Sequence, residues 1–189
     1  MPLIVGLGNP GPSYRNHRHN VGFMIVEKLH DRIGASEWRE KFRGLTSRGL
    51  ITARECHFLL PQTFMNLSGE AVLRAVTGVG AKPADIVVVH DDLDLPFGDV
   101  RVKVGGGHGG HNGLRDITRV IGADYLRVRV GIGRPTVAAV EQYVLSPFSK
   151  EEAAELGGVI DRGVEAIEGI VAEGPSQAMN KTNVRPKKK

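Results

Sequence analysis

The chain has 189 residues, of which 41% are hydrophobic and 24% are charged, values typical of one folded domain and not of a disordered chain. One cysteine, Cys56, excludes an internal disulfide scaffold and favours the reducing cytoplasm, and no apolar run approaches the roughly 18 residues of a membrane-spanning helix. The formal net charge of +4 is unevenly spread, because residues 97–135 carry +4, residues 150–173 carry −5, and residues 181–189 hold five Lys or Arg and no acid.

The first half of the chain predicts buried strands that alternate with helices. Short continuous apolar runs at 3–7 and 86–89 are typical of strands that are buried on both faces. Apolar residues recur at helical spacing over 21–33, where Gly34 is the stop signal, and over 71–76, where we expect Gly78 to end the helix.

The second half predicts two alternating strands and two more helices. Residues 100–104 and 126–132 place apolar side chains on one face and Arg or Lys on the other. An apolar stripe marks a helix at 114–121, and Ser149 with Glu152 forms a capping box that opens a long helix. The fold class is therefore α/β: a single domain over 1–180 with helices on both faces of the sheet, followed by a basic, flexible tail over 181–189.

The polar faces of the two alternating strands carry four cations. If the strands are neighbours, these side chains gather on one surface; they are Arg101, Lys103, Arg127 and Arg129. A phosphate-contact patch for a polyanionic partner is the functional interpretation. The alternative is that the cations lie on the solvated outer face of a sheet edge.

The motif GLGNPG at 6–11 matches the glycine spacing of a dinucleotide-binding loop and follows a strand. That loop also needs a helix that opens at once against the pyrophosphate. Pro10 and Pro12 stand where the helix would begin, and Asp31 falls at the end of a helix instead of a second strand. We therefore predict no nucleotide cofactor.

Polar residues stand where strands end or where loops enter helices, the places where open α/β sheets bind ligands. They are Asn9, His19, Asn66, Asp91 and Asn112, and six of the nine residues at 105–113 are glycine. The structural alternatives are that the asparagines form turns or helix caps and that His19 is a surface or capping residue.

Together these residues favour hydrolysis. A histidine can activate a water molecule as general base, an aspartate can orient the ring, and amides can hold polar groups of the substrate. No G-x-S-x-G nucleophile motif occurs, and Cys56 lies in the strand-like run ECHFLL.

A family resemblance runs through nearly the whole chain, in the blocks GLGNPG, RHNVGF, FMNLSG, HDDLDLPFG, GGGHGGHNGLRDI and RVRVGIGRP, together with Tyr14. In this combination the sequence resembles the bacterial-type peptidyl-tRNA hydrolases. The resemblance implies a monomeric, cytoplasmic α/β domain with a mixed central sheet. It also implies cleavage, without metal or cofactor, of the ester that joins a peptide to the 3′ end of tRNA, which recycles tRNA during translation.

The resemblance further implies roles for ten residues. The catalytic base falls on His19 and its partner on Asp91. The substrate-binding asparagines fall on Asn9, Asn66 and Asn112, and which of them serves the oxyanion stays open. Tyr14, Met65 and His111 match further cleft positions, and Lys103 and Arg129 match cations that meet the 5′ phosphate of the acceptor stem.

Two other functions stay open at this point. The fold could bind RNA without cleaving it, although the intact catalytic set argues against this. A metallohydrolase could use residues of two loops as ligands, namely His90, Asp91, Asp92, His108 and His111, but they lack the H-E-x-x-H spacing of a zinc site.

Overall fold

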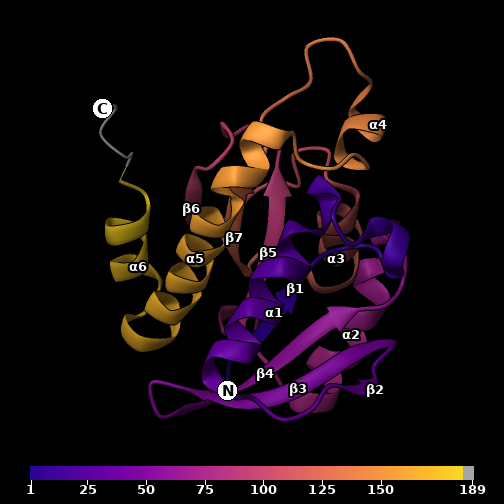
Figure 1. The fold of residues 1–189 in the computed structure, drawn as a ribbon. Coiled ribbons are helices and arrows are strands. Elements are labelled where there is room, and N and C mark those ends of the chain that lie inside the picture. The colour runs from indigo at the N-terminus through magenta and orange to yellow at the C-terminus, as the bar shows by residue number, and fades with distance from the viewer. Residues whose placement is uncertain (185–189) are drawn as a thin grey trace.

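A seven-stranded mixed sheet forms the centre of the computed structural model, which describes residues 1–184 (Figure 1). The strands are β1 (Leu3–Gly6), β2 (Arg39–Lys41), β3 (Gly44–Ile51), β4 (Arg54–Pro61), β5 (Ile86–Asp92), β6 (Val100–Val104) and β7 (Leu126–Gly131). Their order across the sheet is β2-β3-β4-β1-β5-β7-β6. The pairs β4·β1, β1·β5 and β5·β7 are parallel, and the pairs nearer the two edges are antiparallel.

Helices cover both faces of this sheet. They are α1 (Val21–Ile33), α2 (Ser68–Val79), α3 (Asn112–Ile121), α4 (Val140–Val144), α5 (Lys150–Glu173) and α6 (Pro175–Thr182), with short 3-10 turns η1 (Pro12–Tyr14), η2 (Arg18–Asn20), η3 (Met65–Leu67) and η4 (Pro83–Asp85). One core lies between the sheet and α1, α5 and α6, and the other lies between the sheet and α2 and α3. The predicted single α/β domain is confirmed. Among the described helices, none is both long and apolar enough to cross a bilayer.

The central strands contribute to both cores, as their continuous apolar runs predict. In β1, Ile4 faces the core of α1 and α5, whereas Leu3 and Val5 face the core of α2 and α3. In β5, Val87 and Val88 divide in the same way. Alternate side chains of a strand point to opposite faces of the sheet. A strand that is buried under helices on both faces therefore has apolar residues at every position.

The antiparallel edge formed by β2, β3 and β4 was not predicted, apart from the strand-like run at Cys56. Its two tight turns use Phe42-Arg43 and Thr52-Ala53, all with positive φ between 47° and 63°. Turns of this kind usually carry Asn-Gly or another glycine pair, because L side chains disfavour positive φ. These turns lack that signal, which explains why the sequence does not reveal the hairpins.

The expected end of the second helix at Gly78 is wrong. The helix α2 continues to Val79 and ends at Gly80, which has φ of 69° and is the left-handed C-cap. Gly78 serves packing instead, because a Cβ there would lie 2.4 Å from Cε1 of the Phe42 ring.

One of the four cations expected on a common surface, Arg127, is buried instead. Strands β6 and β7 are neighbours, with Arg101 opposite Arg129 and Lys103 opposite Arg127. Arg127, however, is only 2% exposed. Its guanidinium lies 4.4 Å from the centre of the Tyr125 ring and donates to the carbonyl of Gly106 at 2.7 Å. The alternation correctly predicts a strand, but the glycine-rich loop at 105–113 covers the side chain of Arg127.

The sheet edge at β6 is covered by the end of α6. The side chain of Asn183 pairs with the backbone of Val102, accepting from its N–H at 2.8 Å and donating to its C=O at 3.0 Å. The expected boundary at residue 180 therefore falls inside α6, and residues 185–189 of the basic tail lie outside the described residues.

One glycine sets the closest approach between α1 and the sheet. A Cβ at Gly22 would lie 2.3 Å from the carbonyl oxygen of Val89 and 2.7 Å from the backbone nitrogen of Leu7. These neighbours are backbone atoms, so they cannot rotate away. We predict that Gly22→Ala lowers the free energy of unfolding by about 1–3 kcal/mol, as overpacking does elsewhere.

The matched control is Gly157→Ala in α5, where a Cβ meets nothing within 4 Å. Because alanine is the better helix former, this variant should be more stable by about 0.5–1 kcal/mol. Urea unfolding of both variants measures the difference, and equal stability of the two would contradict the proposed close approach.

Candidate active site

The candidate residues meet at the carboxyl ends of the parallel strands. Strands β4 and β5 flank β1 on opposite sides, so the chain leaves β1 for one side and returns on the other. Such a switch point opens a crevice at the carboxyl end of an α/β sheet. Asn9 follows β1, Met65 follows β4, and Asp91 is the next-to-last residue of β5.

The carboxylate of Asp91 is the centre of this site. It is 2% exposed and lies between two imidazoles. Its Oδ2 is 2.8 Å from Nδ1 of His19, and its Oδ1 is 2.8 Å from Nε2 of His111. A buried charge is costly unless it is paired and hydrogen-bonded, and these two rings supply both kinds of compensation.

The N-terminus of α3 fixes the tautomer of His111. The Nδ1 atom of this ring accepts from the backbone N–H groups of Gly113 (3.1 Å) and Leu114 (3.3 Å), as the N-cap of the helix. That nitrogen therefore carries no proton, and Nε2 must donate to Asp91. Both nitrogens of His111 are engaged. His19, in contrast, has Nε2 left as a free basic nitrogen once Nδ1 donates to Asp91.

The charges of the cluster shift its pKa values. Burial alone would raise the pKa of Asp91, but the electrostatic attraction of the His19 and His111 rings and their hydrogen bonds hold it well below its usual range. Burial lowers the pKa of His19, yet the charge of Asp91 and its hydrogen bond outweigh burial and raise that pKa above its ordinary value. Burial lowers the pKa of His90 to about 4, so His90 is neutral.

A second asparagine, Asn20, holds Asn9 in place and was not among the predicted residues. Its Oδ1 accepts from the backbone N–H of Asn9 at 2.9 Å, and its Nδ2 donates to the Asn9 carbonyl at 3.0 Å. The Oδ1 of Asn9 in turn accepts from the backbone N–H of Met65 at 2.7 Å. Because this oxygen is occupied, the amide NH₂ of Asn9 is the group left to donate to a ligand. The only sequence signal for Asn20 is its place beside His19.

Two neighbouring side chains, Arg127 and Met65, hold the glycine-rich loop at 105–113 in place. Arg127 donates to the carbonyls of Gly106 and Gly107, so a residue expected on the surface supports the loop instead. A Cβ at Gly113 would lie 2.7 Å from Sδ of Met65, so this glycine lets buried Met65 pack against the start of α3.

Neither of the other two asparagines is a helix cap, which corrects those structural alternatives. Helix α2 begins at Ser68, after the exposed Asn66, and has no side-chain cap. His111, not Asn112, caps α3. Asn112 is exposed and its Oδ1 receives one long contact of 3.5 Å from Arg115. Both amides are therefore available to a ligand.

The cleft over His19 has a volume of about 420 Å³ and has both cationic and acidic side chains in its lining. Of the predicted residues it is lined by His19, Asp91, Lys103, His111, Asn112 and Arg129. Nε of Arg129 donates to Asp92 at 2.8 Å, which leaves the terminal nitrogens of its guanidinium for an anion. Lys103 is exposed.

The other four predicted residues, Asn9, Tyr14, Met65 and Asn66, do not line this cleft. The Tyr14 ring packs edge-on against Phe64 at a centroid distance of 6.2 Å, and Phe64 precedes Met65. Asn9 lines a neighbouring cavity of about 590 Å³ on the other side of η2.

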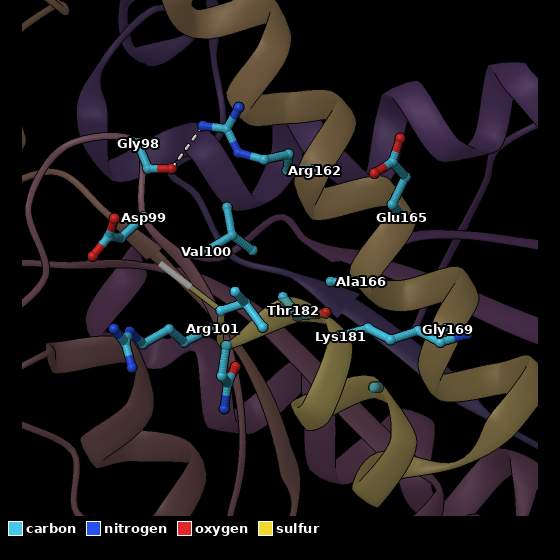
Figure 2. Close-up of a pocket in the computed structure, with 13 residues that line it drawn as sticks. Gly98, Asp99, Val100, Arg101, Arg162, Glu165, Ala166, Gly169, Lys181 and Thr182 are labelled. Atoms are coloured by element: carbon cyan, nitrogen blue, oxygen red, sulfur yellow. Dashed lines mark hydrogen bonds between the residues drawn. The ribbon is translucent and has the colours of Figure 1, made fainter. Parts of the chain in front are cut away.

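A third cavity, of about 560 Å³, contains none of the predicted site residues. Figure 2 shows it between α5, α6 and the edge of β6, with Arg162 donating to the carbonyl of Gly98 at 2.7 Å. The cavity is therefore separate from the His19–Asp91–His111 cluster.

The ligand set expected for a metallohydrolase is not brought together in residues 1–184. The cluster whose donor atoms lie within 4.8 Å of one another consists of His19, Asp91 and His111. Of the expected ligands it contains Asp91 and His111, but not His90, Asp92 or His108. The two 2.8 Å contacts in the cluster are those of direct N–H···O hydrogen bonds.

The matching family model, two similar sequences and a similar solved structure all belong to one family. A family model described as peptidyl-tRNA hydrolase matches residues 3–189. The peptidyl-tRNA hydrolase of Syntrophotalea carbinolica is 48% identical over 187 residues, covering 98% of each chain. That of Geobacter sulfurreducens is 47% identical over 182 residues, covering 96% of this chain and 94% of its own. The crystal structure of peptidyl-tRNA hydrolase from Acinetobacter baumannii superposes with a TM-score of 0.92 at 41% identity, covering 97% of this chain and 95% of that one.

The geometry predicts how His19 titrates. In the wild-type protein its pKa should lie above 6.5, because Asp91 stabilises the imidazolium. In Asp91→Asn the charge is lost while burial remains, so the pKa of His19 should fall below 6.5. Nuclear magnetic resonance titration of the ring Cε1–H signals measures both values, with the distant His57 as the internal control. Identical His19 titration in both proteins would contradict the ion pair.

Proposed function

The chain belongs to the peptidyl-tRNA hydrolase family, and from this premise we propose how its own residues hydrolyse peptidyl-tRNA and release tRNA. The alternative of a module that binds RNA without cleaving it does not hold, because the family and the similar solved structures are hydrolases. One observation carries the proposal for the residues: Asp91 is held by both His19 and His111, and only His19 keeps a basic nitrogen.

His19 acts as the general base. Its Nε2 takes a proton from a water molecule as the water oxygen attacks the carbonyl carbon of the ester. Asp91 stabilises the imidazolium that forms and stays ionised itself, which its strongly lowered pKa supports. The imidazolium then returns the proton to the departing 3′ oxygen of the ribose, so the products are tRNA with a free hydroxyl and a peptide with a free carboxyl group.

The amide groups hold the polar atoms around this reaction. The NH₂ of Asn9 donates to the carbonyl oxygen on which negative charge develops, since its Oδ1 is occupied by Met65 N–H. The exposed amides of Asn66 and Asn112 hold the ribose and the peptide backbone. Neutral amides serve here without adding a net charge near the RNA.

His111, Tyr14 and Met65 complete the site without taking part in proton transfer. His111 keeps Asp91 ionised and fixes its orientation. Met65 fills the wall under Asn9, and Tyr14 offers a ring face beside Phe64 for the substrate.

Lys103 and Arg129 bind the phosphate at the 5′ end of the acceptor stem. Both line the cleft that contains His19. The partner is therefore the acceptor stem and 3′ end of peptidyl-tRNA. One chain supplies every proposed catalytic residue, which supports action as a monomer, and the cytoplasm is where translation provides this substrate.

Removing the base should nearly abolish the reaction. General-base catalysis is typically worth about 10²–10⁴ in rate, so we expect His19→Ala to lower kcat by about that factor while tRNA binding persists. Release of the acyl group from N-blocked aminoacyl-tRNA measures turnover, and His57→Ala is the control histidine. Wild-type turnover in His19→Ala would refute the assignment, and loss of wild-type activity on exhaustive chelation would favour a metallohydrolase.

Removing the two cations should separate binding from chemistry. We expect Lys103→Ala/Arg129→Ala to raise the apparent KM for peptidyl-tRNA and leave kcat nearly unchanged, because the lost binding is shared by ground and transition states. The slope of log KM against log salt should fall in magnitude by about 2, since two phosphate contacts no longer release counterions.

The matched control is Arg162→Ala/Lys181→Ala, which removes the same charge from the cavity between α5 and α6. A blocked aminoacyl group on a short 3′ fragment without a 5′ phosphate should be cleaved equally by wild type and by Lys103→Ala/Arg129→Ala. Equal loss on the fragment and on full tRNA would show that the cations support the fold or the catalytic cluster instead.

A further inference from the structure

Arg18, the residue before His19, is a buried arginine whose side chain the mechanism above does not use. It is 8% exposed. Its guanidinium donates at 2.6 Å each to Oγ of Ser146, to the carbonyl of Pro147 and to Oε1 of Glu152. The same group lies 4.2 Å from the centre of the Tyr143 ring.

These partners run from α4 to the start of α5: Tyr143 lies in α4, Ser146 and Pro147 lie in the connection, and Glu152 lies in the first turn of α5. The backbone adds to the attachment, because the N–H of Arg18 donates to the carbonyl of Ser146 at 2.9 Å, and His17 forms an isolated bridge with Pro147. Glu152 belongs to the capping box of α5, so Arg18 connects η2 to the first turn of that helix. Arginine binds several acceptors in fixed directions, which makes it suited to hold such a joint.

Helix α4 needs such an attachment. It has five residues, and helices this short are not stable by themselves. The segment before it, residues 134–139, runs over the surface, and Val137 there is 95% exposed. Figure 1 shows this loop extending away from the body of the protein, with α4 at its end.

One face of α4 forms part of the catalytic cleft. Val140, Glu141 and Val144 line the cavity that also contains His19 and Asn112. We call these three residues the α4 wall. The α4 wall is joined to the body through Arg18 and through Tyr143, whose hydroxyl donates to the carbonyl of Ile132.

We propose that Arg18 is a positioning residue that holds the α4 wall against the cleft and thereby contributes to substrate binding. This inference rests on the proposed site around His19. The ring of His19 is fixed independently by Asp91, and Asp91 is fixed by His111. Loosening α4 should therefore weaken binding and leave the chemistry of the bound substrate intact.

The test is Arg18→Met, which keeps an apolar stem of similar length and removes the donors. We expect KM for peptidyl-tRNA to rise about tenfold or more and kcat to stay within about twofold of wild type, the signature of lost uniform binding. The pKa of His19 should not change. Hydrogen exchange should become faster in 140–148 and stay unchanged in β5.

The matched control is Arg32→Met. Arg32 also joins the first helical region to α5, but it does so through Glu168 at 3.0 Å, about four turns along that helix from the joint at Glu152. It should leave KM unchanged. A second variant pair, Glu152→Gln and Ser146→Ala, loosens the joint from the other side, and glutamine at 152 preserves the capping box. Each should raise KM, by less than Arg18→Met.

Several results would overturn the proposal. Folded Arg18→Met with wild-type KM would do so, as would a fall in kcat or a shifted His19 pKa, because either change would place the role of Arg18 in the catalytic histidine. If Arg18→Met does not fold, an unchanged KM in both Glu152→Gln and Ser146→Ala overturns the proposal. An active His19→Ala enzyme would refute the assigned base and still leave the KM comparison of Arg18→Met interpretable.

Discussion

The buried carboxylate of Asp91, between the rings of His19 and His111, is the interaction on which the site depends. It is removed from water at the end of β5, so its charge is stable only while both donors stay in place. One donor comes from η2 before α1, and the other comes from the glycine-rich loop before α3. The carboxylate therefore connects elements from the two faces of the sheet at a single point.

Residues without a role in the proposed chemistry hold this arrangement in place. Asn20 fixes both backbone groups of Asn9, and Arg127 fixes two carbonyls of the glycine-rich loop. Gly22 lets α1 approach β5 closely enough for η2 to bring His19 to Asp91. A base and its partner must be held to within a fraction of an ångström, so catalysis depends on this supporting layer as much as on the reacting groups.

The proposed binding groups of the site differ in charge. The proposed mechanism assigns the ester to neutral amides, whereas it assigns the phosphate to Lys103 and Arg129, which line the same cleft as His19 and Asn112. Arg129 is held by Asp92, the residue after Asp91, so the strand that carries the proposed catalytic carboxylate also orients the proposed phosphate-binding group. If the proposed roles hold, the docking of the RNA and the geometry of the ester are coupled through adjacent residues of β5.

The sequence by itself determined the elements whose signals are local. The apolar runs of β1 and β5, the stripe of α1 and the capping box of α5 follow from periodicity and short-range hydrogen bonds, and the places of Asn9, His19 and Asp91 at element ends follow from them. Only the tertiary structure decided what depends on distant neighbours. It buried Arg127 under a loop, made Gly78 a packing contact for Phe42, and gave the capping role to His111 instead of Asn112. A side chain's burial and partners are set by segments far along the chain, and a local pattern contains no information about them.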